Sequence, residues 1–402
     1  MTTSPTAVPA ALERTRRNQS NAYFVAFITL GLAMSSLGPT LPGLAENTRS
    51  SLSQISVLFT AQSLGMLTGN LVSGRYYDRR PAHPFLAIII VIISAMLALI
   101  PFMTSLVPLA AVIFVIGACA GSIDVGGNTL LMWIFGRQVG PRMNALHFFF
   151  GFGALLAPIF VAQAIAFNGS ISWAYWLLAV LVLAAVPLFL RVPSPAIPRA
   201  HTDTDAPVAP TRWLLVILIA TMFFLFVGAE LSFGGWIYTY AISLDLATVT
   251  TAGYLTSLFW AALTFGRLIS IPIAGRVRPR YLLTVDLIGL ALSLGLLLAF
   301  PQSSAVLWIA TFGFGLSTAN AYPTLMVLAE RHLRISGKIT SIFLVGGSLG
   351  SMTVPFLIGQ RFEAAGPQVM MQILLVTVIL TAVVLGLFLL AIRPKATPVL
   401  GG

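Results

Sequence analysis

The sequence predicts an all-α membrane protein with twelve transmembrane helices arranged in two pseudo-symmetric six-helix halves. The chain of 402 residues is 58% hydrophobic and only 8% charged, with a mean hydropathy of +0.95. A membrane span needs about 20 consecutive apolar residues, and this chain contains many such runs. The two halves also repeat one another. These three observations exclude a soluble globular protein.

The charge pattern gives the orientation. The formal net charge is +11, but the arginines lie at the ends of the apolar runs, which is the positive-inside pattern and not the footprint of a nucleic-acid partner. We therefore expect a multi-pass protein of the plasma (inner) membrane with both termini cytoplasmic. The lone Cys119 forms no intrachain disulfide. Metal-binding and nucleotide-binding motifs are absent from the sequence, so we expect no cofactor, no metal and no enzymatic activity.

Composition divides the chain into five parts. We expect a disordered cytoplasmic tail over 1–20, a six-helix half over 21–191, a Pro-, Thr- and Asp-rich cytoplasmic linker over 192–212, a second half over 213–392 and a cytoplasmic tail over 393–402. The expected spans are Tyr23–Leu44, Leu52–Ser73, Phe85–Thr104, Pro108–Phe135, Met143–Phe167, Trp173–Leu190, Trp213–Ile242, Ala252–Ala274, Tyr281–Phe300, Val306–Ala329, Ile339–Phe362 and Val369–Ile392.

The two halves match at a shift of about 197 to 201 residues, as in transporters built from internal repeats. Both halves begin on the same side, so the axis relating them lies along the membrane normal. Small residues recur in the seventh span, which we expect to bend or break there. The matched pairs are Gly31 with Gly228, Gly38 with Gly235, Gly65 with Gly266, Gly74 with Gly275, Gly153 with Gly350, and Pro158 with Pro355.

The most informative polar residues lie between Gly117 and Pro158. Asp124 falls roughly 16 Å from the cytoplasmic end of its helix, near the bilayer middle. Asn128 follows one turn later, and His147 enters the next span at a similar depth, where it can pair with Asn128. Intramembrane acids usually mark ion or substrate pathways, and histidine titrates near neutral pH. Two interpretations remain open, an ion-coupling site and a structural clamp between helices.

The second half offers a different set. We expect Glu230, in the outer half of its span, to bind a cation or substrate or to face an outer aqueous vestibule, and we count it with Asp124 and His147 as an ion-coupling candidate. Arg267 is expected to be structural and to pair with Asp286. For each substrate-binding candidate, the alternative to contact with the substrate is packing in the core or between helices. These candidates are Gln62, Asn128, Trp236, Trp260, Asn320 and Tyr322.

The turn GRYYDRR after the second span resembles the signature of the major facilitator superfamily, in which a Gly is followed after three residues by Asp and Arg. Gly74, Asp78 and Arg79 match it, while Pro81 replaces the later Gly. The resemblance implies transport by alternating access. It also implies that Gly74, Asp78 and Arg79 form a cytoplasmic gate, because the acid of this signature helps to hold the halves together in that family.

A narrower resemblance is carried by IDVGGNTLLMWIFG and NALHFFFGFGALLAP. This pair is similar to the fucose–proton symporter family and, within it, to the sodium-dependent glucose transporter branch. The resemblance implies cation-coupled uptake of a sugar or similar small polar solute, driven by H⁺ or Na⁺. The first-span acid of the fucose symporters is missing here.

Two other functions remain open from sequence, an exporter of drugs or other amphipathic compounds and a transport-inactive sensor or scaffold. We expect a monomer in the lipid bilayer whose partner is its small-molecule substrate.

Overall fold

The computed structural model describes residues 10–197, 212–274, 276–333 and 337–392. Residues 1–9, most of the linker, Gly275 and the tail over 393–402 lie outside this description. The N-terminal half contains α1 (Ala10–Ser35), α2 (Leu37–Thr48), α3 (Leu52–Ile55), α4 (Val57–Tyr77), α5 (Ala82–Leu99), α6 (Leu106–Phe135), α7 (Gly140–Asn168), α8 (Ile171–Leu183) and α9 (Val186–Arg191).

The C-terminal half is also helical throughout its described residues. It contains α10 (Trp213–Ser243), α11 (Val249–Ala274), α12 (Pro279–Ala299), α13 (Ser304–Thr318), α14 (Ala321–His332), α15 (Gly337–Ala365) and α16 (Val369–Ala391).

The predicted crossings are confirmed. Within the described ranges, ten helices are long and apolar enough to span a membrane, and α1 with α2 forms an eleventh span bent by 43°. The expected crossing over Val306–Ala329 falls on α13 and α14, of 15 and 12 residues, which are separated by a break at Ala319–Asn320. An even number of crossings leaves the start of α1 and the end of α16 on the same side, which we call the terminus end. The opposite side is the far end.

The first helix differs from its prediction. It begins at Ala10, so residues 10–20, expected to be disordered, are helical. Ala, Glu and Arg are good helix formers, and the segment is anchored because Gln19 Nε2 donates a hydrogen bond of 2.9 Å to Pro193 O. This bond joins the first helix to the start of the linker.

The seventh span also differs, because α10 is one continuous helix from Trp213 to Ser243. Its glycines are contact points and not breaks. Gly228 lies against Gly350 O, and a Cβ at Gly235 would lie 2.6 Å from the ring of Phe59. A glycine in a transmembrane helix allows a neighbouring helix to approach closely, and that use explains these residues.

The internal repeat is visible in the packing. Gly153 of α7 lies against Ile28 O of α1, and the matching Gly350 of α15 lies against Phe224 O of α10. The first helix of each half therefore contacts the fifth in the same way. The repeat found in the sequence is a repeat of helix contacts.

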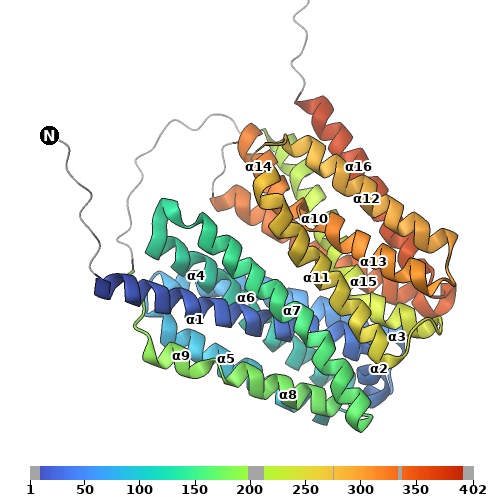
Figure 1. Cartoon of the computed structure of the whole chain (residues 1–402), viewed down its shortest axis with the longest axis horizontal. Coiled ribbons are helices and arrows are strands. Elements are labelled where there is room, and N and C mark those ends of the chain that lie inside the picture. The colour runs from blue at the N-terminus through green and yellow to red at the C-terminus, as the bar shows by residue number, and fades with distance from the viewer. Residues whose placement is uncertain (1–9, 198–211, 275, 334–336, 393–402) are drawn as a thin grey trace, which may run out of the picture.

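The two halves are joined along α7 and α11, where Gly151 lies against Thr264, and at the far end. The Leu52 N–H donates to Glu363 Oε1 at 2.8 Å, and Ser53 Oγ donates to Gln360 Oε1 at 3.0 Å. Phe59 packs on the ring of Trp236. In Figure 1 the two groups of helices converge toward α2 and α3 and separate toward the start of α1 and toward α14. The molecule is thus sealed at the far end and spread at the terminus end.

Candidate functional site

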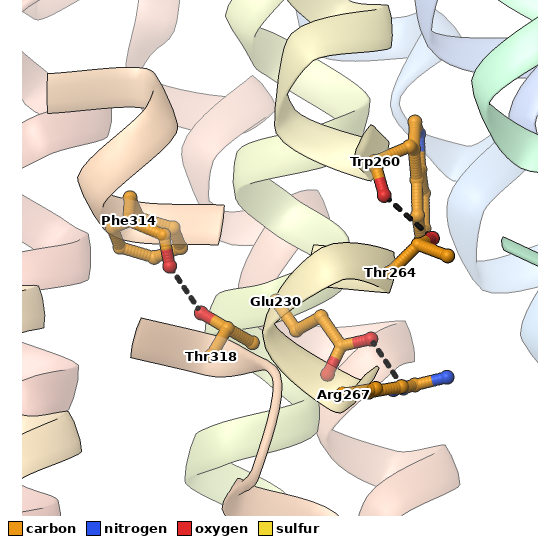
Figure 2. Close-up of polar contacts among 6 residues, drawn as sticks. All are labelled: Glu230, Trp260, Thr264, Arg267, Phe314 and Thr318. Carbon is orange, nitrogen blue, oxygen red and sulfur yellow. Dashed lines mark hydrogen bonds and ion pairs between the residues drawn. The ribbon is translucent and has the colours of Figure 1, made fainter. Parts of the chain in front are cut away.

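The centre of the molecule holds an ion pair between two helices of the C-terminal half. Arg267 Nη2 of α11 lies 3.8 Å from Glu230 Oε1 of α10, and their side chains are 26% and 14% exposed (Figure 2). It is the one ion pair among the residues that the structure describes. Charged groups at membrane depth usually pair with one another, so Glu230 is partnered and does not face an outer vestibule by itself.

The expected pairing of Arg267 with Asp286 is wrong. Asp286 lies on α12, is 6% exposed, and its Oδ2 has no hydrogen-bond partner within the described chain. Arg267 turns instead toward α10, which packs beside α11. Asp286 is therefore a buried acid separate from the central ion pair.

Two threonines beside the pair do not compete for its charges. Thr264 Oγ1 donates to Trp260 O at 2.7 Å, and Thr318 Oγ1 donates to Phe314 O at 2.9 Å (Figure 2). Both hydroxyls are used one turn back in their own helices. Neither hydroxyl therefore forms a hydrogen bond with Glu230 or Arg267.

Asp124 and Asn128 form a second polar group, on α6 of the N-terminal half. Asn128 Nδ2 donates to Asp124 O at 2.8 Å and to Asp124 Oδ1 at 3.1 Å. Both side chains are partly exposed. A carboxylate accepts several hydrogen bonds when ionised, yet this one receives a single donor to its side chain from the described residues. Asp124 therefore keeps acceptor capacity for a cation, a proton or a substrate hydroxyl.

Two further side chains, Tyr322 and His147, link the two polar groups electrostatically across the interface between the halves. Tyr322 of α14 lies close enough to Asp124 and to Arg267 to interact with both charges. His147 of α7 likewise lies within electrostatic range of Arg267. We call Asp124, His147, Glu230, Arg267 and Tyr322 the central polar cluster. Each half contributes to it.

His147 does not make the expected pair with Asn128, whose amide is used by Asp124. The imidazole instead lies edge-on to Phe27 of α1, with ring centroids 5.8 Å apart. This contact holds the ring between α1 and α7.

Asn320 lies at the break between α13 and α14, directly before the N-terminus of α14. Its Oδ1 is buried and has no partner among the described residues. Tyr322 follows, is 38% exposed, and packs edge-on against Phe223. Irregular backbone at membrane depth is tolerated where it lines a protein interior or a cavity, and this break brings Tyr322 to the cluster.

Three predicted substrate residues lie in packed positions. Trp236 is fully buried, its Nε1–H donates to Pro355 O at 3.0 Å, and it stacks on Phe362. Gln62 Nε2 donates to Met34 O at 3.4 Å. Trp260 is 4% exposed, and its Nε1 has no partner in the described part of the chain. Of the three, Trp260 is the one whose unpartnered polar atom is fully buried within the described chain.

The predicted gate residues lie at the terminus end of α4. Asp78 is the C-cap of α4, its backbone N–H lies 3.3 Å from Gly74 O, and both Asp78 and Arg79 are exposed. A Cβ on Gly74 would meet no other atom within 4 Å. The turn is thus open in this arrangement of the halves.

Sequence reasoning missed Arg267 as a member of the site. The available signal was that a charge inside a span needs a partner. Two acids, Glu230 and Asp286, lie within spans of the same half, and the sequence does not choose between them.

The chain matches the family model described as Major Facilitator Superfamily over residues 23–355. It is 32% identical over 358 residues to sodium-dependent glucose transporter 1 of Xenopus laevis, covering 82% of this chain and 72% of that protein. It is 30% identical over 374 residues to sodium-dependent glucose transporter 1A of Mus musculus, covering 84% and 88%.

The fold is similar to that of a solved D-xylose–proton symporter, with a TM-score of 0.74 at 13% identity, covering 92% of this chain and 97% of that one. The fold and the polar cluster between two six-helix halves define a membrane transporter for small molecules and not an enzyme. The chain belongs to the major facilitator superfamily, as its GRYYDRR turn predicts, and its relatives include the sodium-dependent glucose transporters.

Proposed function

We propose that this protein is a cation-coupled carrier that takes up a sugar or similar small polar solute by alternating access. The observation that carries the proposal is the central polar cluster, in which acids and hydrogen-bonding groups from both halves meet at membrane depth. Such groups are costly in a bilayer and usually serve ions or substrates. Two relatives at about 30% identity are named sodium-dependent glucose transporters, which supports the sugar and the cation.

Asp124 is the proposed coupling acid. Its carboxylate has a donor on one oxygen only, from Asn128, and is not neutralised by an ion pair within the described chain. Either Na⁺ or a proton removes that charge. The amide of Asn128 holds one carboxylate oxygen of Asp124, and Tyr322 of the opposite half lies within electrostatic range of that carboxylate.

Glu230 and Arg267 have a different role in this proposal. Glu230 already holds an internal cation, the guanidinium of Arg267. The pair therefore offers both acceptors and donors to the hydroxyls of a sugar without a change in net charge. Tyr322, within electrostatic range of Arg267, adds a partly exposed hydroxyl, and the buried Asn320 Oδ1, two residues before it, has no partner among the described residues.

The orientation follows from the arginines. The terminus end carries most of the basic residues, so we place it in the cytoplasm, together with the turn that contains Asp78. The structure then corresponds to an inward-facing carrier, with its far end closed to the outside. Opening of that seal would require the contacts at Leu52 and Ser53 to break.

The test is uptake of radiolabelled hexoses and pentoses into proteoliposomes with a Na⁺ gradient, a pH gradient or neither. We expect concentrative uptake with one of the gradients and only equilibration without them. Failure of every sugar to accumulate under both gradients would contradict the proposal.

Asp124→Asn separates coupling from binding. We expect this variant to bind sugar and to equilibrate it, but not to accumulate it against a gradient. The matched control is Asp286→Asn, which removes another buried intramembrane acid outside the cluster and should leave accumulation intact. If Asp124→Asn accumulates sugar like the wild type, Asp124 is a structural clamp.

Export of an amphipathic compound is the second candidate, favoured by aromatic rings near the interface between the halves. Phe150 of α7 lies edge-on to Trp260 of α11, with centroids 6.2 Å apart, and Phe24 stacks on Phe149. Cells expressing the protein would then retain less of a fluorescent cationic dye. Unchanged retention across a dye panel, together with sugar accumulation, rejects this candidate.

A further inference from the structure

A second, smaller site lies at the terminus end of the C-terminal half, away from the central polar cluster. It is a cavity of about 210 Å³ where the start of α12, the end of α14 and the end of α16 meet. The residues that line it are Arg278, Pro279, Arg280, Leu328, Arg331, His332, Leu389 and Ile392.

The polar part of this cavity is entirely basic or titratable. Three arginines line it and no acid does. The one ion pair of the described chain is elsewhere, so Arg278, Arg280 and Arg331 have no carboxylate partner within that part of the protein. Like charges that converge on one cavity repel each other, and an anion between them would remove this cost.

Arg280 is the arginine whose lack of a hydrogen-bond acceptor is clearest. Its Nη2 donates to Tyr281 OH at 2.9 Å, and its guanidinium lies 4.7 Å from the centre of the Tyr281 ring. Its Nε, however, is buried and has no partner among the described residues. A buried donor without an acceptor destabilises the folded protein, because it has lost its hydrogen bonds to water. A phosphate oxygen is an acceptor that suits a guanidinium.

The remaining wall is apolar. Leu328, Leu389 and Ile392 lie beside the arginines. Both α12 and α16 are membrane spans, of which α12 begins and α16 ends at this cavity. The cavity therefore sits where a bilayer changes from headgroups to acyl chains. Basic pockets between transmembrane helices at this level suit anionic lipid headgroups.

We propose that this cavity binds one anionic phospholipid, with its phosphate held by Arg278, Arg280 and Arg331 and its first chain carbons against Leu328 and Leu389. The lipid joins the ends of α12, α14 and α16 and so stabilises the C-terminal half. Its site is independent of the transported solute. A failed transport assay would therefore not contradict the lipid site, and a failed lipid assay would not contradict the proposed transport function.

The test is thermal unfolding of the whole purified chain in detergent micelles, with dioleoyl phosphatidylglycerol or dioleoyl phosphatidylcholine titrated in. The wild type should gain stability at a lower concentration of phosphatidylglycerol than of phosphatidylcholine. Each arginine near an anionic headgroup is worth about fivefold in affinity, so Arg278→Gln with Arg331→Gln should raise the half-saturating concentration about 25-fold. Native mass spectrometry of the same samples counts the lipid retained per protein.

The matched control is Arg14→Gln with Arg17→Gln, which removes the same charge from exposed positions on the first helix at the same end. It should keep the preference for phosphatidylglycerol. If the paired variant fails to elute as one species, the two single variants replace it, and each should lose about fivefold. Equal stabilisation by both lipids overturns the proposal. So does an unchanged preference in the variants, or full stabilisation by inorganic phosphate alone, which would indicate a soluble anion.

Discussion

The ion pair between Glu230 and Arg267 makes the sharpest prediction about stability. Arg267→Gln leaves Glu230, which is 14% exposed, without its cation, and Glu230→Gln leaves Arg267 in the same condition. The double variant carries two neutral amides of similar size at the same positions. The two single changes should therefore lower the free energy of unfolding by more in sum than the double change does, because each single change leaves one charge unpaired at membrane depth.

The magnitude follows from the geometry. At 3.8 Å and an effective dielectric constant of about 20, two unit charges attract by about 4 kcal/mol. Desolvation of both groups offsets part of this attraction, more so for Glu230 than for the more exposed Arg267. A coupling energy of about 1–3 kcal/mol remains, within the range measured for residues in direct contact.

The assay is a double-mutant cycle on unfolding in mixed micelles of a mild detergent and sodium dodecyl sulfate. Arg361→Gln serves as the control, since it removes an exposed arginine at the far end, and it should change stability by less than about 0.5 kcal/mol. Single-variant effects that simply add to give the double-variant effect, within about 0.5 kcal/mol, would refute the coupling.

Three further changes test individual contacts. Trp236→Phe should cost about 1 kcal/mol of stability through its lost hydrogen bond and leave the KM for sugar unchanged; a tenfold rise in KM would make this ring a substrate contact. Gly38→Ala puts a Cβ 2.9 Å from a glycine carbonyl of α10 and should loosen the contacts between the halves at the far end. A reporter cysteine introduced among these contacts, in a chain without Cys119, should then react faster with a water-soluble maleimide. An unchanged rate argues against tight packing there. Asn128→Ala removes the donor to Asp124 and should raise the apparent affinity for the coupling cation about tenfold, because the carboxylate loses a charge-assisted hydrogen bond with which the cation competes; unaltered cation dependence shows that the donor is not needed.

The sequence predicted the crossings well because each depends on a local property. A span is recognisable from about 20 consecutive apolar residues. Most of the expected spans begin and end within a few residues of the observed helices. The internal repeat was equally readable, because close helix approach demands small residues at matched places. Gly153 and Gly350 were paired from sequence, and both proved to touch a carbonyl of the first helix in their own half.

The candidate site was only partly predictable, because its contacts depend on how helices are rotated against each other. Asp124, His147, Glu230 and Tyr322 were chosen from their chemistry; Glu230 pairs with Arg267, and the others lie within electrostatic range of Arg267 or of one another. The partner of Arg267 was not predictable, since two acids compete for it in the sequence and only the packing of α11 beside α10 decides.

The glycines of the seventh span were misread for a related reason. A glycine that breaks a helix and a glycine that admits a neighbouring helix look the same in a sequence. Trp236 is another such case, because an indole suits a sugar site as well as a packed interface. Within the protein, its N–H donates to Pro355 O and its ring stacks on Phe362, so both groups that could bind a sugar are already used.

The arrangement of the central polar cluster bears on how coupling would work under the proposed mechanism. A ligand shifts a conformational equilibrium only by the difference in its binding free energy between the two states. Arg267 can supply such a difference, because its guanidinium is paired with Glu230 of its own half and lies within electrostatic range of Tyr322, which Asp124 of the other half also affects. While Arg267 is held by Glu230, Asp124 has no cation of its own and is open to one from solution. A rotation of the halves that carried Arg267 toward Asp124 would expel that cation, so coupling requires the pair with Glu230 to be tighter when the terminus end is open.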